Sequence, residues 1–343
     1  MKKKLTIVLC LVLVVALLAG CGKKNVSTST DVPKESASIA PSPAEKVNVT
    51  IAGLAGPTSM GMIKMISDKA LNSDSYSVTY EIANAPDTLT GKLINGEVQI
   101  AALPTNAAAV LYNKTQGQIQ FLAQNTLGVL YLVGKDTAGV TSLKDLAGKT
   151  VDLSGSGAVP EYAMNYILDK AGIKDKVTLN FLTDHASVAQ ALLAGDAELA
   201  VLPQPFVTQV LAKDPSMKIL LDLNKEWDAA SSGSSVLSMG CLAIRKDFAD
   251  ANPEFVAEFL KQYEASVGFV NANPADAAKL IAEASIVPSA EIAEKAIPYC
   301  NIMYKSAQDA KTEINGFLQV LFDSDPASVG GKMPDDGFYY GVR

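Results

Sequence analysis

The sequence predicts an α/β fold made of two similar lobes, each with a mainly parallel sheet. Strand-like alternation and helical periodicity follow one another along residues 47–222, which is typical of parallel sheets covered by helices. The stretch 93–104 recurs as 192–203, with Leu, Gly, Ala, Leu and Pro at the same places and an acid after each Gly. A chain of 343 residues, 48% hydrophobic and 19% charged, can bury the cores of two such units. Two similar lobes in turn predict a ligand cleft between them.

The N-terminal residues 1–21 have the pattern of a targeting segment. Three lysines at positions 2–4 precede the apolar run 5–18, which is too short for an ordinary membrane span. The run ends in Leu18-Ala19-Gly20-Cys21, which resembles the lipobox of bacterial lipoproteins. Cys21 is then expected to carry acyl chains such as palmitate and to hold the mature protein on the extracytoplasmic face of the cell membrane. The alternative is a plain signal anchor with a chance cysteine. Residues 22–46, rich in Ser, Thr, Pro, Lys and Glu, are expected to form a flexible tether.

The first unit is expected to begin after this tether. Val47 starts an alternating strand, and a Gly-rich loop at 53–59 separates that strand from an amphipathic helix. The remaining pattern predicts strands at 76–82, 98–103, 120–125 and 127–134, and helices at 60–71, 88–95 and 106–112. This order of strands and helices favours a parallel sheet with helical crossovers.

The pattern restarts at residue 150, after a short helix and turn at 143–149. Strands are expected at 150–153, 177–181, 199–202 and 218–222, and helices at 161–171, 186–194 and 205–212. The internal repeat therefore covers about 47–125 and 150–222. In both copies the Gly, Gly96 or Gly195, is expected to end a helix, and the Pro, Pro104 or Pro203, to begin the next one.

The last third of the chain is expected to be mostly helical. An irregular loop at 223–235 contains Trp227 and precedes a strand at 236–245. Asn252-Pro253 and Asn273-Pro274 each have the pattern of a helix start. Helices are predicted at 252–272, 274–285, 289–300 and 309–323. The aromatic residues of the tail, Phe338 to Tyr340, are expected to pack back on the body.

Charge and composition exclude several functions. The formal net charge is −7, and nucleic-acid binding requires clustered Lys and Arg, so no nucleic-acid partner is expected. Cys241 and Cys300 are the cysteines of the folded part, and they are expected to be either two small buried residues or one disulfide. No Cys/His spacing resembles a metal site, and His185 is the only histidine. Neither a metal, a cofactor nor a His-based catalytic triad is therefore expected.

Four loops are expected at the carboxyl ends of parallel strands, where ligands bind in open α/β sheets. They are the loops at 53–59, 104–106, 154–157 and 203–205. Helix N-termini at such loops favour carboxylate, sulfonate or phosphate groups. Each loop alone is an ordinary capped turn, but the repeat brings the four towards one cleft. The candidate ligand-binding residues are Gly56, Pro57, Thr58, Ser59, Thr105, Asn106, Asn125, Ser154, Ser156, Gly157 and Gln204.

Several residues keep two interpretations. His185 aligns with Pro86 of the other copy, and it either caps a helix or contacts the ligand. Trp227 either stacks on the ligand or packs at a hinge. Gly155-Ser156-Gly157 lacks the third Gly of a dinucleotide fingerprint and the Lys of a P-loop, so it predicts no nucleotide site. The acids next to Gly96 and Gly195 lie at the strand start and are expected on the solvated surface, so no catalytic pair is predicted.

Taken together, these features make the chain similar to a substrate-binding lipoprotein of an ABC importer, of the nitrate/sulfonate/taurine (SsuA-like) family that also includes binders of thiamine-pyrimidine precursors. The resemblance spans about residues 47–325. It depends on the lipobox and tether, the opening loop Gly56-Pro57-Thr58-Ser59, the segments INGEVQIAALPTNAA and LLAGDAELAVLPQPFV, the segment KDLAGK at 144–149, and the stretch from Met239-Gly240 to Lys246-Asp247-Phe248.

The resemblance implies a type II periplasmic-binding fold, with two α/β lobes joined by two crossover strands. Lobe one is then expected at 47–135 and 240–343, and lobe two at 136–239, with crossovers near 133–137 and 236–243. Ser238, on the second crossover, becomes a further expected ligand contact. The resemblance also implies a monomer that closes on a small molecule and docks on a permease driven by ATPases.

Two departures from the family pattern bear on the ligand and on catalysis. The four loops contain no Arg or Lys. A sulfonate or nitrate would then be held by helix ends and neutral donors, or the ligand is not strongly anionic. The pyrimidine-synthase relatives use several His and Cys residues, which argues against that activity in a chain with one His. Two alternatives remain, a sensory receptor for a signalling partner and a surface enzyme using Glu161 or His185 for proton transfer.

Overall fold

The structure is a computed structural model that describes residues 45–83 and 86–341. The targeting segment, the expected lipid site Cys21 and nearly all of the tether lie outside these residues. In the part of the chain that is described, none of the helices combines the length and the apolar character needed to span a bilayer.

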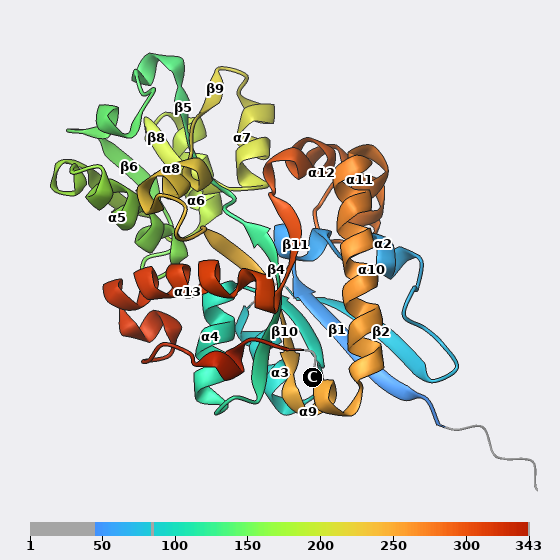
Figure 1. The fold of residues 1–343 in the computed structure, drawn as a ribbon. Helices are drawn as coiled ribbons and strands as arrows, with labels where there is room; N and C mark the ends of the chain where they lie inside the picture. The colour runs from blue at the N-terminus through green and yellow to red at the C-terminus, as the bar shows by residue number, and fades with distance from the viewer. Residues whose placement is uncertain (1–44, 84–85, 342–343) are drawn as a thin grey trace, which may run out of the picture. The chain divides into compact units, whose positions relative to one another are not determined.

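The first sheet has six strands in the order β11-β4-β10-β3-β1-β2 (Figure 1). Three of them are parallel, because β1 (Val47–Leu54) pairs with both β2 (Tyr76–Ala83) and β3 (Ile100–Leu103). The late strand β10 (Ser238–Arg245) lies antiparallel between β3 and β4 (Ile119–Leu127). The edge strand β11 (Ile302–Ser306) pairs with β4 and was not expected from the sequence.

The second sheet repeats this arrangement with five strands in the order β7-β6-β8-β5-β9. Here β6 (Thr150–Leu153) is parallel to β7 (Thr178–Phe181) and β8 (Leu199–Pro203). The antiparallel strand β5 (Leu130–Lys135) lies between β8 and β9 (Met217–Asp222). The two sheets share one strand order, so the predicted internal repeat is confirmed.

The helices of the two units follow the strands as the pattern predicts. Those of the first unit are α1 (Pro57–Met60), α2 (Ile63–Ser67), α3 (Pro86–Asn95) and α4 (Thr105–Lys114). Those of the second are α5 (Val159–Lys170), α6 (His185–Ala194), α7 (Phe206–Lys213) and α8 (Leu223–Ser231). The C-terminal part contributes α9 (Lys246–Ala251), α10 (Pro253–Ala272), α11 (Pro274–Glu283), α12 (Ala290–Ala296) and α13 (Ala307–Ser324). Short 3-10 turns occur at η1 (Asp136–Ala138), η2 (Leu143–Leu146), η3 (Lys174–Lys176), η4 (Ile297–Tyr299), η5 (Pro326–Val329) and η6 (Asp336–Phe338).

Three local expectations were wrong. The helix expected at 60–71 is split into α1 and α2, with a turn at Gly61 and Met62. The loop expected at 223–235 contains α8, which is capped by the carboxylate of Asp222 accepting from the Asn224 N–H. The chain leaves the first sheet at residues 128–129 and not at 133–137, since β5 already pairs within the second sheet.

Both faces of the six-stranded sheet are covered, which explains its nearly continuous apolar strands. Along β10, Cys241 and Ala243 pack into one core with α4 and α13, while Leu242 and Ile244 pack into another with α2, α10 and α11. A third core lies between the five-stranded sheet and helices α6 and α7. The tail packs back as expected, because Phe338 and Tyr339 are buried against Phe121. Cys241 and Cys300 are both buried free thiols, so the disulfide alternative was wrong.

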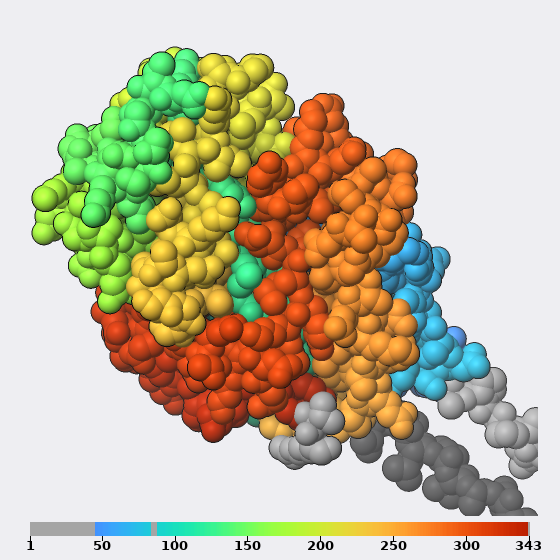
Figure 2. Space-filling model, turned by 45° about the horizontal axis from the view of Figure 1, so that its top comes forward, coloured from blue at the N-terminus to red at the C-terminus, as the bar shows by residue number. Residues whose placement is uncertain are grey.

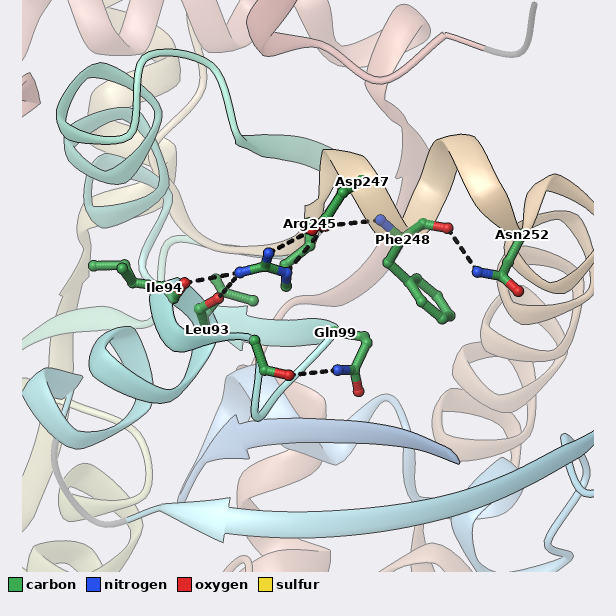
Figure 3. Close-up of polar contacts among 8 residues, drawn as sticks. Leu93, Ile94, Gln99, Arg245, Asp247, Phe248 and Asn252 are labelled. Atoms are coloured by element: carbon green, nitrogen blue, oxygen red, sulfur yellow. Dashed lines mark hydrogen bonds and ion pairs between the residues drawn. The ribbon is translucent and has the colours of Figure 1, made fainter. Parts of the chain in front are cut away.

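The repeated Gly turn has the structural role that the sequence indicated. Gly96 and Gly195 have φ values of +82° and +81°, a region that favours glycine. In the first unit the turn is further tied down by Arg245 (Figure 3). Its guanidinium donates to the carbonyls of Leu93 and Ile94 at 3.0 and 2.8 Å, at the end of α3, and it pairs with Asp247. This cluster lies at the start of β3, the opposite end of the sheet from the predicted ligand loops.

Candidate ligand site

The first group of predicted site residues forms a buried polar network beneath the end of β3. Thr105 begins α4, and its hydroxyl lies 2.7 Å from that of Ser238 at the start of β10. The amide Nε2 of Gln124, on β4, donates to Ser238 Oγ at 3.3 Å. All three side chains are at most 1% exposed, and Gln124 Oε1 has no hydrogen-bond partner among the described residues. Sequence reasoning missed Gln124, although it directly precedes the predicted Asn125 on the same strand.

A second network is centred on Asn125. Its Nδ2 donates to the carbonyl of Thr58 at 2.9 Å, and its Oδ1 accepts from the Thr126 hydroxyl at 3.0 Å. Gly240 is required next to it, because a Cβ there would lie 2.6 Å from Asn125 Oδ1 and from the Thr58 methyl. Asn125 therefore fixes the opening loop to the central strands.

In the opening loop, Gly56 has open space beside its Cα, whereas Ser59 is buried and hydrogen-bonded. Gly56 has φ +109°, which strains any other residue, and a Cβ there would meet no atom within 4 Å. Its N–H donates to the Ile286 carbonyl at 3.0 Å. Pro57 begins the helix α1, and the buried Ser59 donates back to the Leu54 carbonyl at 2.5 Å. The Ser59 hydroxyl is thus occupied within its own turn.

In the second unit, Ser154 and His185 are paired. Ser154 Oγ and His185 Nδ1 lie 2.5 Å apart, and the His185 ring packs 5.6 Å from that of Phe206. Burial lowers the pKa of His185, and the neighbouring Asp184 carboxylate opposes this shift in part. The ring is therefore neutral near pH 7, and its tautomer decides whether the Ser154 hydroxyl donates to Nδ1 or accepts from it. The sequence left the role of His185 open, because the two residues are 31 positions apart and are brought together by the pairing of β6 with β7 and by the packing of α6 on the sheet.

Three predicted residues have their polar groups occupied by the protein itself. The Glu161 carboxylate accepts from the Gly157 N–H at 2.7 Å and from the Ser156 hydroxyl at 3.3 Å. An anion at this loop would have to displace Glu161. Asn106 donates to the Ser328 carbonyl at 3.2 Å, which ties α4 to the C-terminal segment.

In Gln204, by contrast, one of the two polar groups of the side-chain amide has no hydrogen-bond partner among the described residues. Its Oε1 accepts from the backbone N–H of Thr208 at 3.3 Å and from the Thr208 hydroxyl at 2.8 Å. Its Nε2 is buried and lacks a hydrogen-bond partner within the described residues. The side chain is 3% exposed, so this donor is not satisfied by bulk water.

Tyrosine side chains connect the second unit to the C-terminal part of the chain. The Tyr131 hydroxyl donates to the Tyr299 carbonyl at 2.7 Å, and Tyr162 lies 3.1 Å from the Asp325 carboxylate. Burial, followed by this carboxylate, raises the pKa of Tyr162 to about 12. Figure 2 shows a hollow between the yellow residues near α8 and the orange-red C-terminal segments, with teal residues at its floor.

Trp227 is a core residue of this contact. It is fully buried between Tyr166 and Phe317, with ring centroids at 4.5 and 5.8 Å, and its Nε1 donates to Ser235 Oγ. A tryptophan without exposed surface offers no face to a ligand, so the stacking interpretation was wrong and the packing interpretation is confirmed.

Hydrogen bonds thus join predicted residues in two pairs, Asn125 with Thr58 and Thr105 with Ser238. In the second unit the predicted residues bond to other side chains, Ser154 to His185 and Gln204 to Thr208. Within residues 45–83 and 86–341, no hydrogen bond joins Thr58, Thr105 or Asn125 to Ser154 or Gln204. In the same part of the chain, no group of three His, Cys, Asp or Glu side chains is arranged to hold a metal. Apart from the Glu161 carboxylate and the His185 imidazole, the arrangement offers hydroxyls, amides and backbone N–H groups, which is the chemistry of binding.

Comparison with known proteins agrees with this geometry. A family model described as "ABC transporter, phosphonate, periplasmic substrate-binding protein" matches residues 63–293. An ABC transporter structure from Parabacteroides distasonis is 26% identical with a TM-score of 0.74, covering 86% of this chain and 99% of that one. No curated protein sequence matches the chain.

Two sulfonate-binding proteins share the fold. The aliphatic sulphonate binding protein SsuA of Escherichia coli is 13% identical with a TM-score of 0.67, covering 86% of this chain and 94% of its own. The alkanesulfonate-binding SsuA of Xanthomonas axonopodis pv. citri, bound to MOPS, is 16% identical with a TM-score of 0.59, covering 85% and 96%. At these identities the likeness concerns the fold alone. The predicted type II periplasmic-binding fold is confirmed.

Proposed function

The chain belongs to the family of ABC transporter periplasmic substrate-binding proteins, and we propose that it captures a small polar or anionic molecule between its two lobes and delivers it to an import permease. Proteins of this family are the substrate-binding components of ABC import systems and act outside the cytoplasm. Their task is binding and not catalysis.

The observation that carries this proposal is the pair of sheets with one strand order, joined by two short connections. The chain passes between them at residues 128–129 and again at 232–237. Because only two short segments of chain connect the two lobes, the lobes can move about a hinge. A ligand that binds both lobes shifts the equilibrium between the open and closed states towards the closed state. We place lobe one at 47–127 and 238–343 and lobe two at 130–231.

The ligand proposed is a small molecule with an oxyanion head, such as a phosphonate or a sulfonate. The family description supports the first and the fold neighbours the second. Ser154, held by His185, and Thr105, held by Ser238, supply neutral hydroxyls at strand ends. Thr105 also begins α4, whose 10 residues contribute a partial positive charge at that end. This design binds an anion without Lys or Arg.

Two further parts of the proposal lie outside the described residues. Cys21 is the lipid attachment site, and residues 22–46 are the tether that lets a monomer reach its permease. Replacing Cys21 by Ala should abolish the incorporation of labelled palmitate into the protein. A C21A protein that is labelled like the native one would contradict the anchor.

The binding proposal is tested by thermal unfolding of the purified protein with methylphosphonate, methanesulfonate or nitrate. A ligand at 100 times its Kd should stabilise the folded state by about 2.7 kcal/mol. Ser154→Ala should weaken the binding that stabilises the native protein on the order of tenfold, since it removes one directed hydrogen bond. Ser266→Ala, at a similarly buried serine of α10 whose hydroxyl accepts from the Lys64 N–H, is the control and should bind normally. If no small oxyanion or wider metabolite panel shifts the melting temperature, the proposal is wrong.

A further inference from the structure

A cavity of about 470 Å³ lies at the junction of the two lobes. Here α7 and α12 are neighbours (Figure 1). One wall comes from α7 and β9 of the second lobe. The other comes from α12 and η4, which pack on the first lobe through α11. The volume falls in the range of small-molecule sites. Its lining consists of Gln204, Thr208, Leu211, Ala212, Ile219, Lys295, Pro298 and Tyr299.

The unpaired amide of Gln204 lies in this lining, and its orientation is fixed. The backbone N–H of Thr208 can only donate, so the atom of Gln204 that faces it must be the oxygen. Nε2 is then the free group, a buried donor without a partner in the described part of the chain. Buried donors are nearly always satisfied in native proteins, so this one points to an acceptor that arrives with a ligand.

The rest of the lining is suited to a ring. Leu211, Ile219 and Pro298 are apolar, and Tyr299 is 46% exposed, one of the few large apolar side chains that the described residues leave open. The Tyr299 ring is positioned by Tyr131, because the two ring centroids lie 6.2 Å apart with the rings nearly perpendicular, and the Tyr299 carbonyl accepts from the Tyr131 hydroxyl. Exposed aromatic faces with defined positions bind other rings. Lys295 is the only cation in the lining, and it already pairs with Glu291 at 2.8 Å.

We propose that this cavity binds the organic part of the transported molecule, an aromatic or heteroaromatic ring with a hydrogen-bond acceptor that receives the Gln204 amide. This inference rests on the proposed function, since Gln204 in the lining directly follows β8, one of the strands whose ends are proposed to hold the ligand. A ring bound here touches both lobes, so it adds to the free energy of closure. The substrate class is therefore a ring-bearing organic anion and not inorganic phosphate, sulfate or nitrate.

The test compares three probes by calorimetric titration of the native protein. Methylphosphonate has the head alone, benzylphosphonate adds a ring, and 4-pyridylmethylphosphonate adds a ring with one acceptor nitrogen. We expect affinity to rise on the order of tenfold at each step. Gln204→Glu keeps the acceptor for Thr208 and removes the free donor, so it should abolish the advantage of the pyridyl over the benzyl probe. Ala212→Trp should fill the cavity and remove the advantage of both rings, while Ala275→Trp, at an exposed alanine of α11 outside the cavity, should not.

A second measurement does not depend on the head group. In ¹⁵N spectra the Gln204 side-chain amide, identified by its absence in Q204E, should shift with millimolar 4-methylpyridine and not with equal toluene. Equal affinity for all three phosphonates, together with no such shift, would overturn the ring pocket and leave the proposed function standing. A shift with 4-methylpyridine but no binding of any phosphonate would keep the pocket and contradict the oxyanion head.

Discussion

Tyr131 in the second sheet and Tyr299 beside the first are joined twice, by a hydroxyl-to-carbonyl hydrogen bond of 2.7 Å and by an edge-to-face ring contact. Burial raises the pKa of Tyr131, so its hydroxyl remains a donor across the physiological range. Tyr131 is the second residue of β5, directly after the first connection between the sheets. The pair therefore links the second sheet to η4 close to this connection.

Tyr131→Phe should shift the lobes towards an open state. The variant loses one hydrogen bond, worth about 1 kcal/mol, so ligand affinity should fall about fivefold and small-angle scattering of the free protein should show a larger radius. Tyr339→Phe is a matched control, since Tyr339 is equally buried and donates to Asn315 Oδ1 at 2.7 Å within the first lobe. It should lose similar stability without a change in affinity. An unchanged affinity in Y131F would show that the pair does not restrain closure.

The single tryptophan should report a buried environment. Because Trp227 has no exposed surface, its emission should be blue-shifted and acrylamide should quench it weakly. Trp227→Ala should lower the free energy of unfolding by about 3–5 kcal/mol. Trp227→Phe keeps most of the packing with Tyr166 and Phe317 but loses the Ser235 hydrogen bond, so it should lose less. Emission like that of free tryptophan would contradict the packing of α8.

His185 should make stability depend on pH. Burial lowers its pKa in the folded protein below the ordinary value near 6.5, so the unfolded chain binds a proton first as the pH falls. The stabilisation is complete above pH 6.5 and is lost as the pH falls through the lowered pKa. Urea unfolding between pH 7.5 and 5.5 should show a steeper loss in the native protein than in His185→Gln. Parallel pH profiles for the two proteins would rule out this role.

Arg245 should matter for stability and not for the ligand. Arg245→Met removes the donors to Leu93 and Ile94 and the pair with Asp247, so unfolding should become easier by about 1–3 kcal/mol. Ligand affinity should stay the same, because the cluster lies at the start of β3, at the end of the sheet opposite the predicted ligand loops. Arg245→Lys should rescue only part of the loss, since one ammonium cannot reach both carbonyls and the carboxylate. Full rescue by Lys would mean that charge alone is needed.

The repeat made most of the fold predictable. Its strands and helices have strong periodicity, and Gly96 and Gly195 mark the same turn in both copies. The prolines do not: Pro104 directly precedes α4, whereas Pro203 ends β8 and the helix α7 begins only at Phe206, so the helix start expected at Pro203 was wrong. The edge strand β11 gave no such signal, because its five residues follow Asn301 at φ +43° and pair with β4 only through irregular register. The helix α8 was hidden by the Ser/Gly run that follows it and by its few apolar residues.

The sequence predicted which residues lie at the candidate site, but not which residues they form hydrogen bonds with. Strand ends identify Thr105, Ser154 and Gln204, but the bonds that orient them come from distant segments. The contact of Thr105 with Ser238 spans 133 residues and depends on β10 entering between β3 and β4. Glu161 accepts hydrogen bonds from the Ser156 hydroxyl and the Gly157 N–H. Whether its carboxylate reaches these donors depends on the local side-chain conformation, which the residue pattern alone does not decide.

The strand orders also show how this chain is divided. All five strands of the second sheet come from one uninterrupted stretch, from Leu130 to Asp222, whereas the first sheet draws on residues on both sides of it. The chain leaves the first sheet at Leu127 and returns at Ser238, and these two residues are paired neighbours. In its connectivity the second lobe is therefore an insertion into a loop of the first, so the first lobe cannot complete its sheet until the whole insertion has been synthesised.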